Sequence, residues 1–329
     1  MKLSSRDSFV LYNAPFSTKT WLIQGVWEPL LDSGKGFVVQ TFDGEDAFIL
    51  KGEKRNLSKS DKFVITVEEE LKTEEEQTRL EYEEQLNKFI KACNVELEKV
   101  ISSRVVLFRA TKTIDVYALF LELKKKYPSA FVYVFNIPNR GMWVGATPEI
   151  LVKEKNGIVE TMALAGTKPN KNIAWTSKEL EEHAFVVEDI KEKLRKNKQG
   201  FSIGEVETVQ AGEVYHLKTK IEINKGKSSS LQIAQILHPT SAVCGMPQDK
   251  AKEFIFKNEN YNRTFYTGFL GWVGEKETDL YVNLRCMRVY KNGGEIFVGG
   301  GITRGSIAKK EWKETELKSR TLLSILEKM

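Results

Sequence analysis

Residues 131–167, FVYVFNIPNRGMWVGATPEILVKEKNGIVETMALAGT, carry the clearest pattern of secondary structure in the chain. It contains three consecutive runs that are rich in aromatic and β-branched residues, at 131–137, 141–154 and 160–167. Such runs, separated by short breaks, are typical of neighbouring strands. We therefore predict an antiparallel meander at the centre of the chain.

Helical patterns flank this meander on both sides. Residues 115–126 carry apolar side chains on one face and are followed by Pro128, and residues 177–196 repeat the pattern. The remaining predicted elements are strands near 37–41, 63–66, 99–111 and 295–303, strand-rich sequence from the end of the 177–196 helix to about 224, and helices near 68–90, 231, 249 and 308–327. Because strands and helices do not alternate regularly, we predict an α+β fold with largely antiparallel sheets and helices packed on and between them.

Composition describes a soluble enzyme-sized chain. The 329 residues are 41% hydrophobic and 29% charged, with a formal net charge of +5. The lysines are interleaved with acids, which favours small anions over nucleic acid as ligands. Three widely spaced cysteines allow neither a disulfide framework nor a zinc knuckle. We expect a cytoplasmic protein with no membrane attachment, since no apolar run or signal-peptide pattern is present. We also expect no obligatory protein partner.

Two glycine motifs resemble phosphate-binding loops but lack glycines that the sequence patterns of those loops require. Gly226–Ser228 lacks the earlier glycine of a P-loop, because Ile221 stands there, and a dinucleotide fingerprint that starts at Gly299 would meet Arg304 instead of glycine. The triplet 299–301 still indicates that backbone approaches another strand or a ligand closely.

Two pairs of glutamates are spaced for one helix face each. Glu179 and Glu182 are three residues apart, as are Glu311 and Glu314. Taken alone, each pair indicates no more than a charged surface. If the fold brought the pairs together, their oxygens would suit a hard cation such as Mg²⁺, which commonly takes one or two carboxylates plus substrate oxygens.

An ordered series of motifs resembles the chorismate-utilising enzymes, which include isochorismate synthases, salicylate synthases, anthranilate synthase component I and aminodeoxychorismate synthases. The motifs are KVISSR (99–104), GATPE (145–149), ALAGT (163–167), KELEEH (178–183), VYHL (214–217), HPTSAVCGMP (238–247), RTFYTGFLGW (263–272), LRCMRV (284–289), GGGIT (299–303) and EWKET (311–315). The resemblance covers roughly residues 94–325. It implies one chorismate-binding catalytic domain over 1–329, with a shortened variable part at 1–90 and the catalytic core at 91–329.

The resemblance also implies roles for the matching residues. Glu182 and Glu314 would bind Mg²⁺, supported by Glu179 and Glu311. Arg285, helped by Tyr266 and the backbone near the glycine triplet, would bind the enolpyruvyl carboxylate of chorismate. The substrate-binding positions are Gly166, Thr167, His238, Tyr266, Arg285, Gly299, Gly301 and Lys318.

Two positions indicate which reaction the resemblance implies. Lys99 stands where isochorismate and salicylate synthases keep a lysine that activates water, and Ala165 replaces the nucleophilic lysine of aminodeoxychorismate synthases. We therefore expect an isochorismate synthase for menaquinone or siderophore biosynthesis, with Lys99 as general base and Glu149 as general acid. The alternatives are a salicylate synthase, an anthranilate synthase component I, and a relative that binds chorismate without turnover.

Overall fold

The computed structural model describes residues 1–31, 34–58, 61–72, 75–211 and 214–329. Its helices are α1 (Arg79–Cys93), α2 (Val116–Lys126), α3 (Ser177–Lys196), α4 (Ser230–Leu237), α5 (Gln248–Asn258) and α6 (Ala308–Leu326). Its strands are β1 (Lys2–Ser4), β2 (Phe9–Asn13), β3 (Thr20–Pro29), β4 (Gly36–Gln40), β5 (Ala47–Asn56), β6 (Val64–Thr66), β7 (Lys99–Arg109), β8 (Phe131–Ile137), β9 (Gly141–Thr147), β10 (Ile150–Lys155), β11 (Ile158–Lys168), β12 (Gly200–Ala211), β13 (Val214–Asn224), β14 (Gly245–Met246), β15 (Phe269–Val273), β16 (Glu277–Val282), β17 (Cys286–Tyr290) and β18 (Gly293–Ile302).

The burial of the central strand β8 accounts for its largely apolar sequence. All seven of its residues are buried. Phe131, Tyr133 and Phe135 join an aromatic core between the two halves of the sheet. Val132 and Val134 point the other way, into an aliphatic core that α2 and α6 cover. Because successive side chains of a strand point to opposite faces, the aromatic and aliphatic residues of β8 alternate.

Antiparallel pairing joins nearly the whole chain into one strand order. Among the described residues that order is β12-β13-β11-β10-β16-β15-β4-β5-β3-β2-β8-β9-β17-β18-β7-β14, with β1 and β6 forming a separate parallel pair. The strands β2 to β5 of the N-terminal part lie in the middle of this order, since β2 pairs with β8 and β4 with β15. The predicted α+β fold with largely antiparallel sheets is confirmed.

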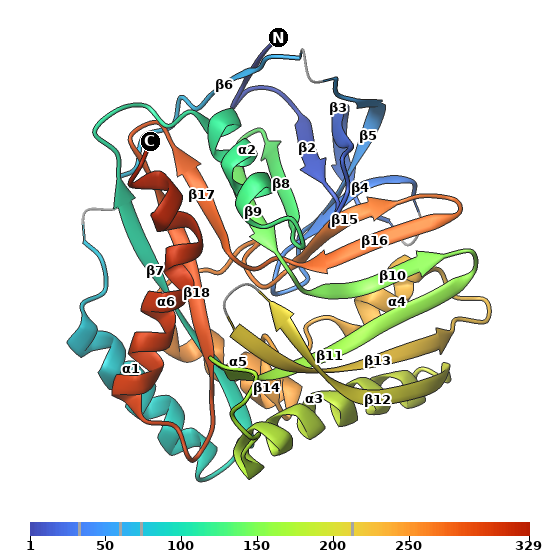
Figure 1. Ribbon diagram of the computed structural model, residues 1–329, viewed down its shortest axis with the longest axis vertical. Helices are drawn as coiled ribbons and strands as arrows, with labels where there is room; N and C mark the ends of the chain where they lie inside the picture. The colour runs from blue at the N-terminus through green and yellow to red at the C-terminus, as the bar shows by residue number, and fades with distance from the viewer. Residues whose placement is uncertain (32–33, 59–60, 73–74, 212–213) are drawn as a thin grey trace.

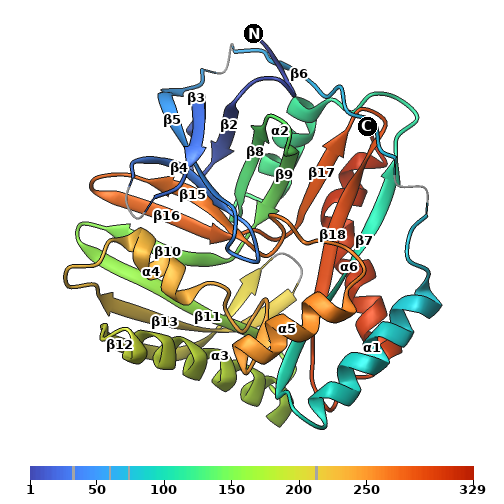
Figure 2. The same ribbon diagram turned by 180° about the vertical axis from the view of Figure 1, so that it is seen from behind.

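Helices cover the outer faces of the curved sheet (Figures 1 and 2). Helices α2 and α6 pack over the strands around β8 and β18, and α3 and α4 pack over β10 and β11. Helices α1 and α5 lie beside β7 in a smaller core. Within the described residues, no helix is long and apolar enough to span a membrane.

The predicted meander breaks at Pro148 and Glu149. Strands β8 and β9 form an antiparallel hairpin, but β9 then pairs with β17, whereas β10 pairs with β11 and β16. The predicted run 141–154 is therefore two strands. Pro148 has no amide hydrogen to donate to a ladder, which favours the break. The crossing places Glu149 between the two halves of the sheet.

The helix predicted at 68–90 is shorter than expected. Helix α1 begins at Arg79, because the Thr78 and Glu81 side chains bond reciprocally to each other's backbone N–H groups. The glutamates upstream serve a different purpose: Glu69 pairs with Arg288 at 3.0 Å, which holds this segment against β17. Residues 73–74 of that prediction lie outside the described residues. The helices predicted at 115–126, 177–196 and 308–327 are confirmed.

Replacing Phe131 by alanine should destabilise the fold by about 3–5 kcal/mol, because it leaves a cavity in the aromatic core. The Phe131 ring is 0% exposed and stacks on Tyr281 with a centroid distance of 4.5 Å. Urea unfolding would measure the loss. The matched control is Phe16→Ala, at a side chain that is 80% exposed. Equal losses for the two variants would contradict the assignment of Phe131 to the core.

Candidate active site

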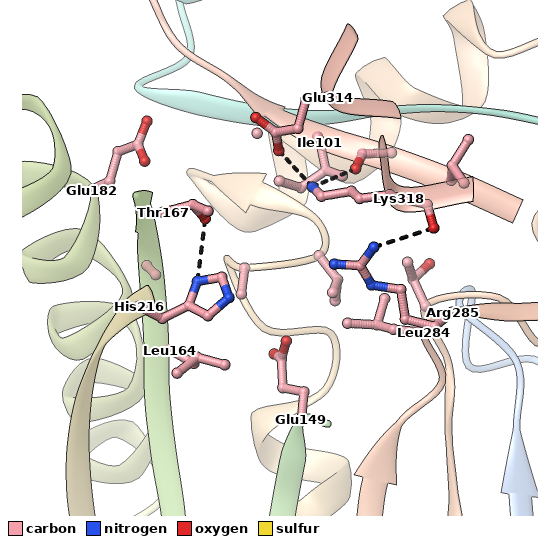
Figure 3. Close-up of a pocket in the computed structure, with 18 of the residues that line it drawn as sticks. Ile101, Glu149, Leu164, Thr167, Glu182, His216, Leu284, Arg285, Glu314 and Lys318 are labelled. Atoms are coloured by element: carbon pink, nitrogen blue, oxygen red, sulfur yellow. Dashed lines mark hydrogen bonds and ion pairs between the residues drawn. The ribbon is translucent and has the colours of Figure 1, made fainter. Parts of the chain in front are cut away.

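A cavity of about 230 Å³ opens where β7, β18, β11, α3 and α6 meet. Figure 3 shows side chains from these separate elements pointing into the same space, with Glu149, His216 and Arg285 on different sides of it. The residues that line it are Lys99, Ile101, Pro148, Glu149, Leu164, Ala165, Gly166, Thr167, Glu179, Glu182, His216, Ala242, Val243, Tyr266, Thr267, Leu284, Arg285, Phe297, Val298, Gly299, Gly300, Gly301, Glu311, Glu314 and Lys318. All predicted site residues except His238 are among them.

The glycine triplet 299–301 forms one wall of the cavity. It lies on β18, directly opposite residues 101–103 of β7. A Cβ atom at Gly301 would lie 2.8 Å from Cε of Lys99, and one at Gly299 would lie 3.0 Å from the Tyr266 hydroxyl. At Gly300 it would face the carboxylates of Glu314 and Glu311, at 3.5 and 3.7 Å. Each missing side chain therefore leaves room for a polar group of the site.

Lys99 reaches the cavity from β7, and Glu149 reaches it from the crossing between β9 and β10. Lys99 lies at the start of β7 and is only 5% exposed. Burial lowers the pKa of Lys99 below its ordinary value, although Glu182 and Glu149 act in the opposite direction. Burial raises the pKa of Glu149 to about 7, against the effect of Lys99, Lys318 and Arg285. Burial therefore shifts both groups toward their neutral forms, which is the direction that a general base and a general acid need.

Cationic side chains gather on the side of the cavity next to α6. Lys318 donates to the Gly299 carbonyl at 2.8 Å and pairs with Glu314 at 2.6 Å. Arg285 donates to the Lys318 carbonyl at 3.3 Å, which directs its guanidinium along the same wall (Figure 3). Burial lowers the pKa of Arg285, so this cation is poorly solvated and suits a bound anion.

His216 is a site residue that the sequence predictions did not assign. Its Nδ1 lies 2.9 Å from the Gly166 carbonyl and 3.2 Å from the Thr167 hydroxyl. These contacts orient the imidazole toward the cavity, and burial lowers its pKa. The only available signal was its place in the VYHL motif, because a single histidine on a strand carries no spacing pattern.

The four predicted metal ligands form two pairs on facing helices. Glu179 and Glu182 come from α3, and Glu311 and Glu314 come from α6. Glu179 also accepts from the Thr176 amide at 2.9 Å, at the start of α3. In the described part of the chain, no three acidic, histidine or cysteine side chains lie close enough to hold a metal without other ligands.

The donor set nevertheless fits Mg²⁺ held jointly with a substrate. Of the described residues that line the cavity, five are carboxylates and three are cationic, so a bound dicarboxylate would add to an excess of negative charge. Mg²⁺ usually binds through one or two protein carboxylates and completes its shell with water and substrate oxygens. Glu182 and Glu314 could supply these two carboxylates.

His238 is not among the residues that line the cavity, so the structure does not bring it together with the other predicted substrate-binding residues. Its Nε2 lies 3.2 Å from the carbonyls of both Thr41 and Phe42. Burial lowers its pKa to about 4, so the ring is neutral and donates one hydrogen bond to this backbone. Its motif position is therefore structural: it holds the 238–247 segment against the turn that follows β4.

The sequence matches the chorismate-binding enzyme family over residues 44–327. Isochorismate synthase MenF of Haemophilus influenzae is 31% identical over 242 residues, and the match covers 70% of this chain and 56% of that protein. The chain thus spans little more than half the length of this curated relative.

Solved structures agree with the fold. Isochorismate synthase MenF of Escherichia coli superimposes with a TM-score of 0.83 at 20% identity, covering 97% of this chain and 89% of that one. Anthranilate synthase component I of Streptococcus pneumoniae gives a TM-score of 0.70 at 17% identity, over 96% and 90% of the two chains. At these identities the likeness concerns the fold alone.

The raised pKa of Glu149 predicts a pH-dependent gain from Glu149→Gln. The native state binds a proton more tightly than the unfolded chain, so the wild-type protein loses stability as pH rises from about 4.5 to 7. The variant lacks this loss and should be more stable than wild type by about 1–3 kcal/mol at pH 8, with a smaller difference at pH 5. Urea unfolding at both pH values would measure it. A difference that stays constant would contradict the raised pKa.

Proposed function

The chain belongs to the chorismate-binding enzyme family, and on that premise we propose that it is a Mg²⁺-dependent isochorismate synthase. The proposal is carried by the positions of Lys99 and Glu149. The lysine is buried and the acid is half-buried, and they lie on separate walls of one cavity. The product would feed menaquinone or siderophore biosynthesis.

Substrate binding follows from the charges on the cavity walls. Arg285 would bind the enolpyruvyl carboxylate of chorismate through its planar guanidinium, with Tyr266 and the backbone of the glycine triplet beside it. Lys318 lies on the same wall and adds positive charge. Glu182 and Glu314 would hold Mg²⁺, which when bound neutralises the ring carboxylate and fixes the ring.

Turnover would consist of a substitution with a shift of the ring double bonds. Lys99 in its neutral form takes a proton from water, whose oxygen forms a bond to C2. Glu149 gives its proton to the C4 hydroxyl, which leaves as water while the ring double bonds move. One water enters and one leaves, so atoms balance and no oxidant is needed. Each proton transfer of this kind contributes roughly 10²–10⁴-fold to the rate.

We expect purified protein to convert chorismate to isochorismate when Mg²⁺ is present, and to lose this activity in EDTA. Chromatographic separation of the products would test it. Salicylate with pyruvate would identify a salicylate synthase instead. Anthranilate formed with ammonium would contradict the role of Lys99 in activating water, and unchanged chorismate would refute the proposed activity.

Two lysines that lie on strands provide the test variant and its matched control for this assay. Lys99→Ala should lower kcat by roughly 10²–10⁴-fold, since it removes the base. Lys51→Ala removes a lysine of β5 whose side chain is 51% exposed and should leave kcat unchanged. Circular dichroism would check that both variants fold. Near-normal turnover by a folded Lys99→Ala would show that another group acts as base.

Glu182→Ala should raise the Mg²⁺ concentration needed for half-maximal activity by roughly tenfold or more, equivalent to about 1.4 kcal/mol of binding. The control is Glu181→Ala, at the adjacent exposed glutamate of α3. Mg²⁺ titration of activity and of thermal stability would compare the two. Identical titrations for both variants would contradict the assignment of Glu182 as a ligand.

A further inference from the structure

Strand β7, which carries Lys99, is paired with β14 at only two residues. Its ladder with β14 covers Lys99 and Val100, and the Ile101 amide then donates to the Cys244 carbonyl at 2.9 Å. In a regular ladder the Cys244 amide would return a bond to the Ile101 carbonyl. It donates instead to the Thr240 carbonyl at 3.0 Å, so the chain turns away from β7.

Two side chains take over the pairing at this point. Arg263 Nη2 donates to the Ile101 carbonyl at 2.8 Å, where the missing amide would have been. Glu259 Oε1 accepts from the Ser103 amide at 2.8 Å and from its hydroxyl at 2.7 Å. Because residues 101 and 103 face the same edge of the strand, the two side chains continue the ladder that the backbone leaves.

Glu259 and Arg263 are also a buried ion pair. Arg263 Nε lies 2.7 Å from Glu259 Oε2, and Nη2 lies 2.6 Å from Oε1. Both side chains are 2% exposed. A third guanidinium nitrogen, Nη1, donates to the Val243 carbonyl at 3.0 Å. The polar groups of the pair therefore bond to the backbone of β7 and of the segment that turns away from it. The bond between Arg263 and Glu259 is bidentate, a geometry that among side chains only arginine offers.

Two of the residues held by this pair line the cavity, but the pair itself does not. These two are Ile101 and Val243, and Lys99 lies two residues before Ile101 on the same strand. Glu259 and Arg263 line a separate hollow next to α5, which runs beside β7 (Figure 2). The carbonyl of Arg263 also accepts from the Tyr266 amide at 2.8 Å.

We propose that the Glu259–Arg263 pair is a positioning element that replaces the missing strand on the edge of β7 and thereby holds Lys99 in register with the opposite cavity walls. The part of this inference that concerns turnover rests on the proposed function. Neither residue touches substrate. The pair acts through Ile101, Ser103 and Val243, and a loss of register would displace the base from its reacting position, where about 1 Å can cost roughly 10²-fold in rate.

Arg263→Lys tests the proposal most directly, because it keeps the positive charge beside Glu259 but replaces the guanidinium fork, whose three nitrogens bond to Glu259, Ile101 and Val243, with a single nitrogen that cannot reproduce this geometry. We expect kcat to fall roughly 10–100-fold with KM changed less than about threefold. Hydrogen–deuterium exchange should become faster in peptides covering residues 99–105. Glu259→Gln with Arg263→Gln, which removes both charges together, should give the same local pattern without an unpaired buried ion.

The control is Glu253→Gln with Lys257→Gln, a pair that is also four residues apart but exposed on α5. It should change neither kcat nor exchange at 99–105. Unchanged kcat and exchange in Arg263→Lys would overturn the proposal. So would faster exchange spread evenly over all strands, which indicates a purely stabilising role. If wild-type protein did not convert chorismate, the proposed function would fail, whereas the exchange measurements would still decide whether the pair holds β7.

Discussion

The close pairing of β7 with β18 is the constraint on which the site depends. Residues 101–103 lie directly opposite the glycine triplet 299–301, so the wall of the cavity is backbone rather than side chain. A Cβ atom at position 301 would lie 2.8 Å from Cε of Lys99, and one at position 300 would lie 3.5 Å from a Glu314 carboxylate oxygen. A side chain at position 301 would therefore crowd Lys99, whereas one at position 300 would extend toward the α6 glutamates.

Burial gives Lys99 and Glu149 their acid–base character. Five carboxylates and three cationic side chains line the described walls of one small cavity, and the charged forms of Lys99 and Glu149 are poorly solvated there. Burial therefore raises the pKa of Glu149 to about 7 and lowers that of Lys99, even though each lies near opposite charge. The same excess of carboxylates makes a divalent cation a suitable companion for a dicarboxylate substrate.

Much of this arrangement could be predicted from local patterns, and the exceptions have physical causes. Amphipathic periodicity located α3 and α6 to within one residue at each end. The helix at 68–90 was too long, because the start of α1 depends on the Thr78 cap rather than on glutamate content. The predicted site included His238 and not His216, although His216 is the histidine that lines the cavity. Whether a histidine faces backbone or a cavity depends on strands far away in the sequence.

The sequence alone was sufficient to predict most of the strands and helices, the family, and the residue types available for chemistry, because periodicity and motif order are local properties. The tertiary structure decided which of those residues meet. It split the run 141–154 so that Glu149 crosses between sheet halves, brought α3 and α6 to one cavity, and placed Glu259 and Arg263 on the edge of β7. Contacts between distant segments depend on packing, which local patterns do not encode.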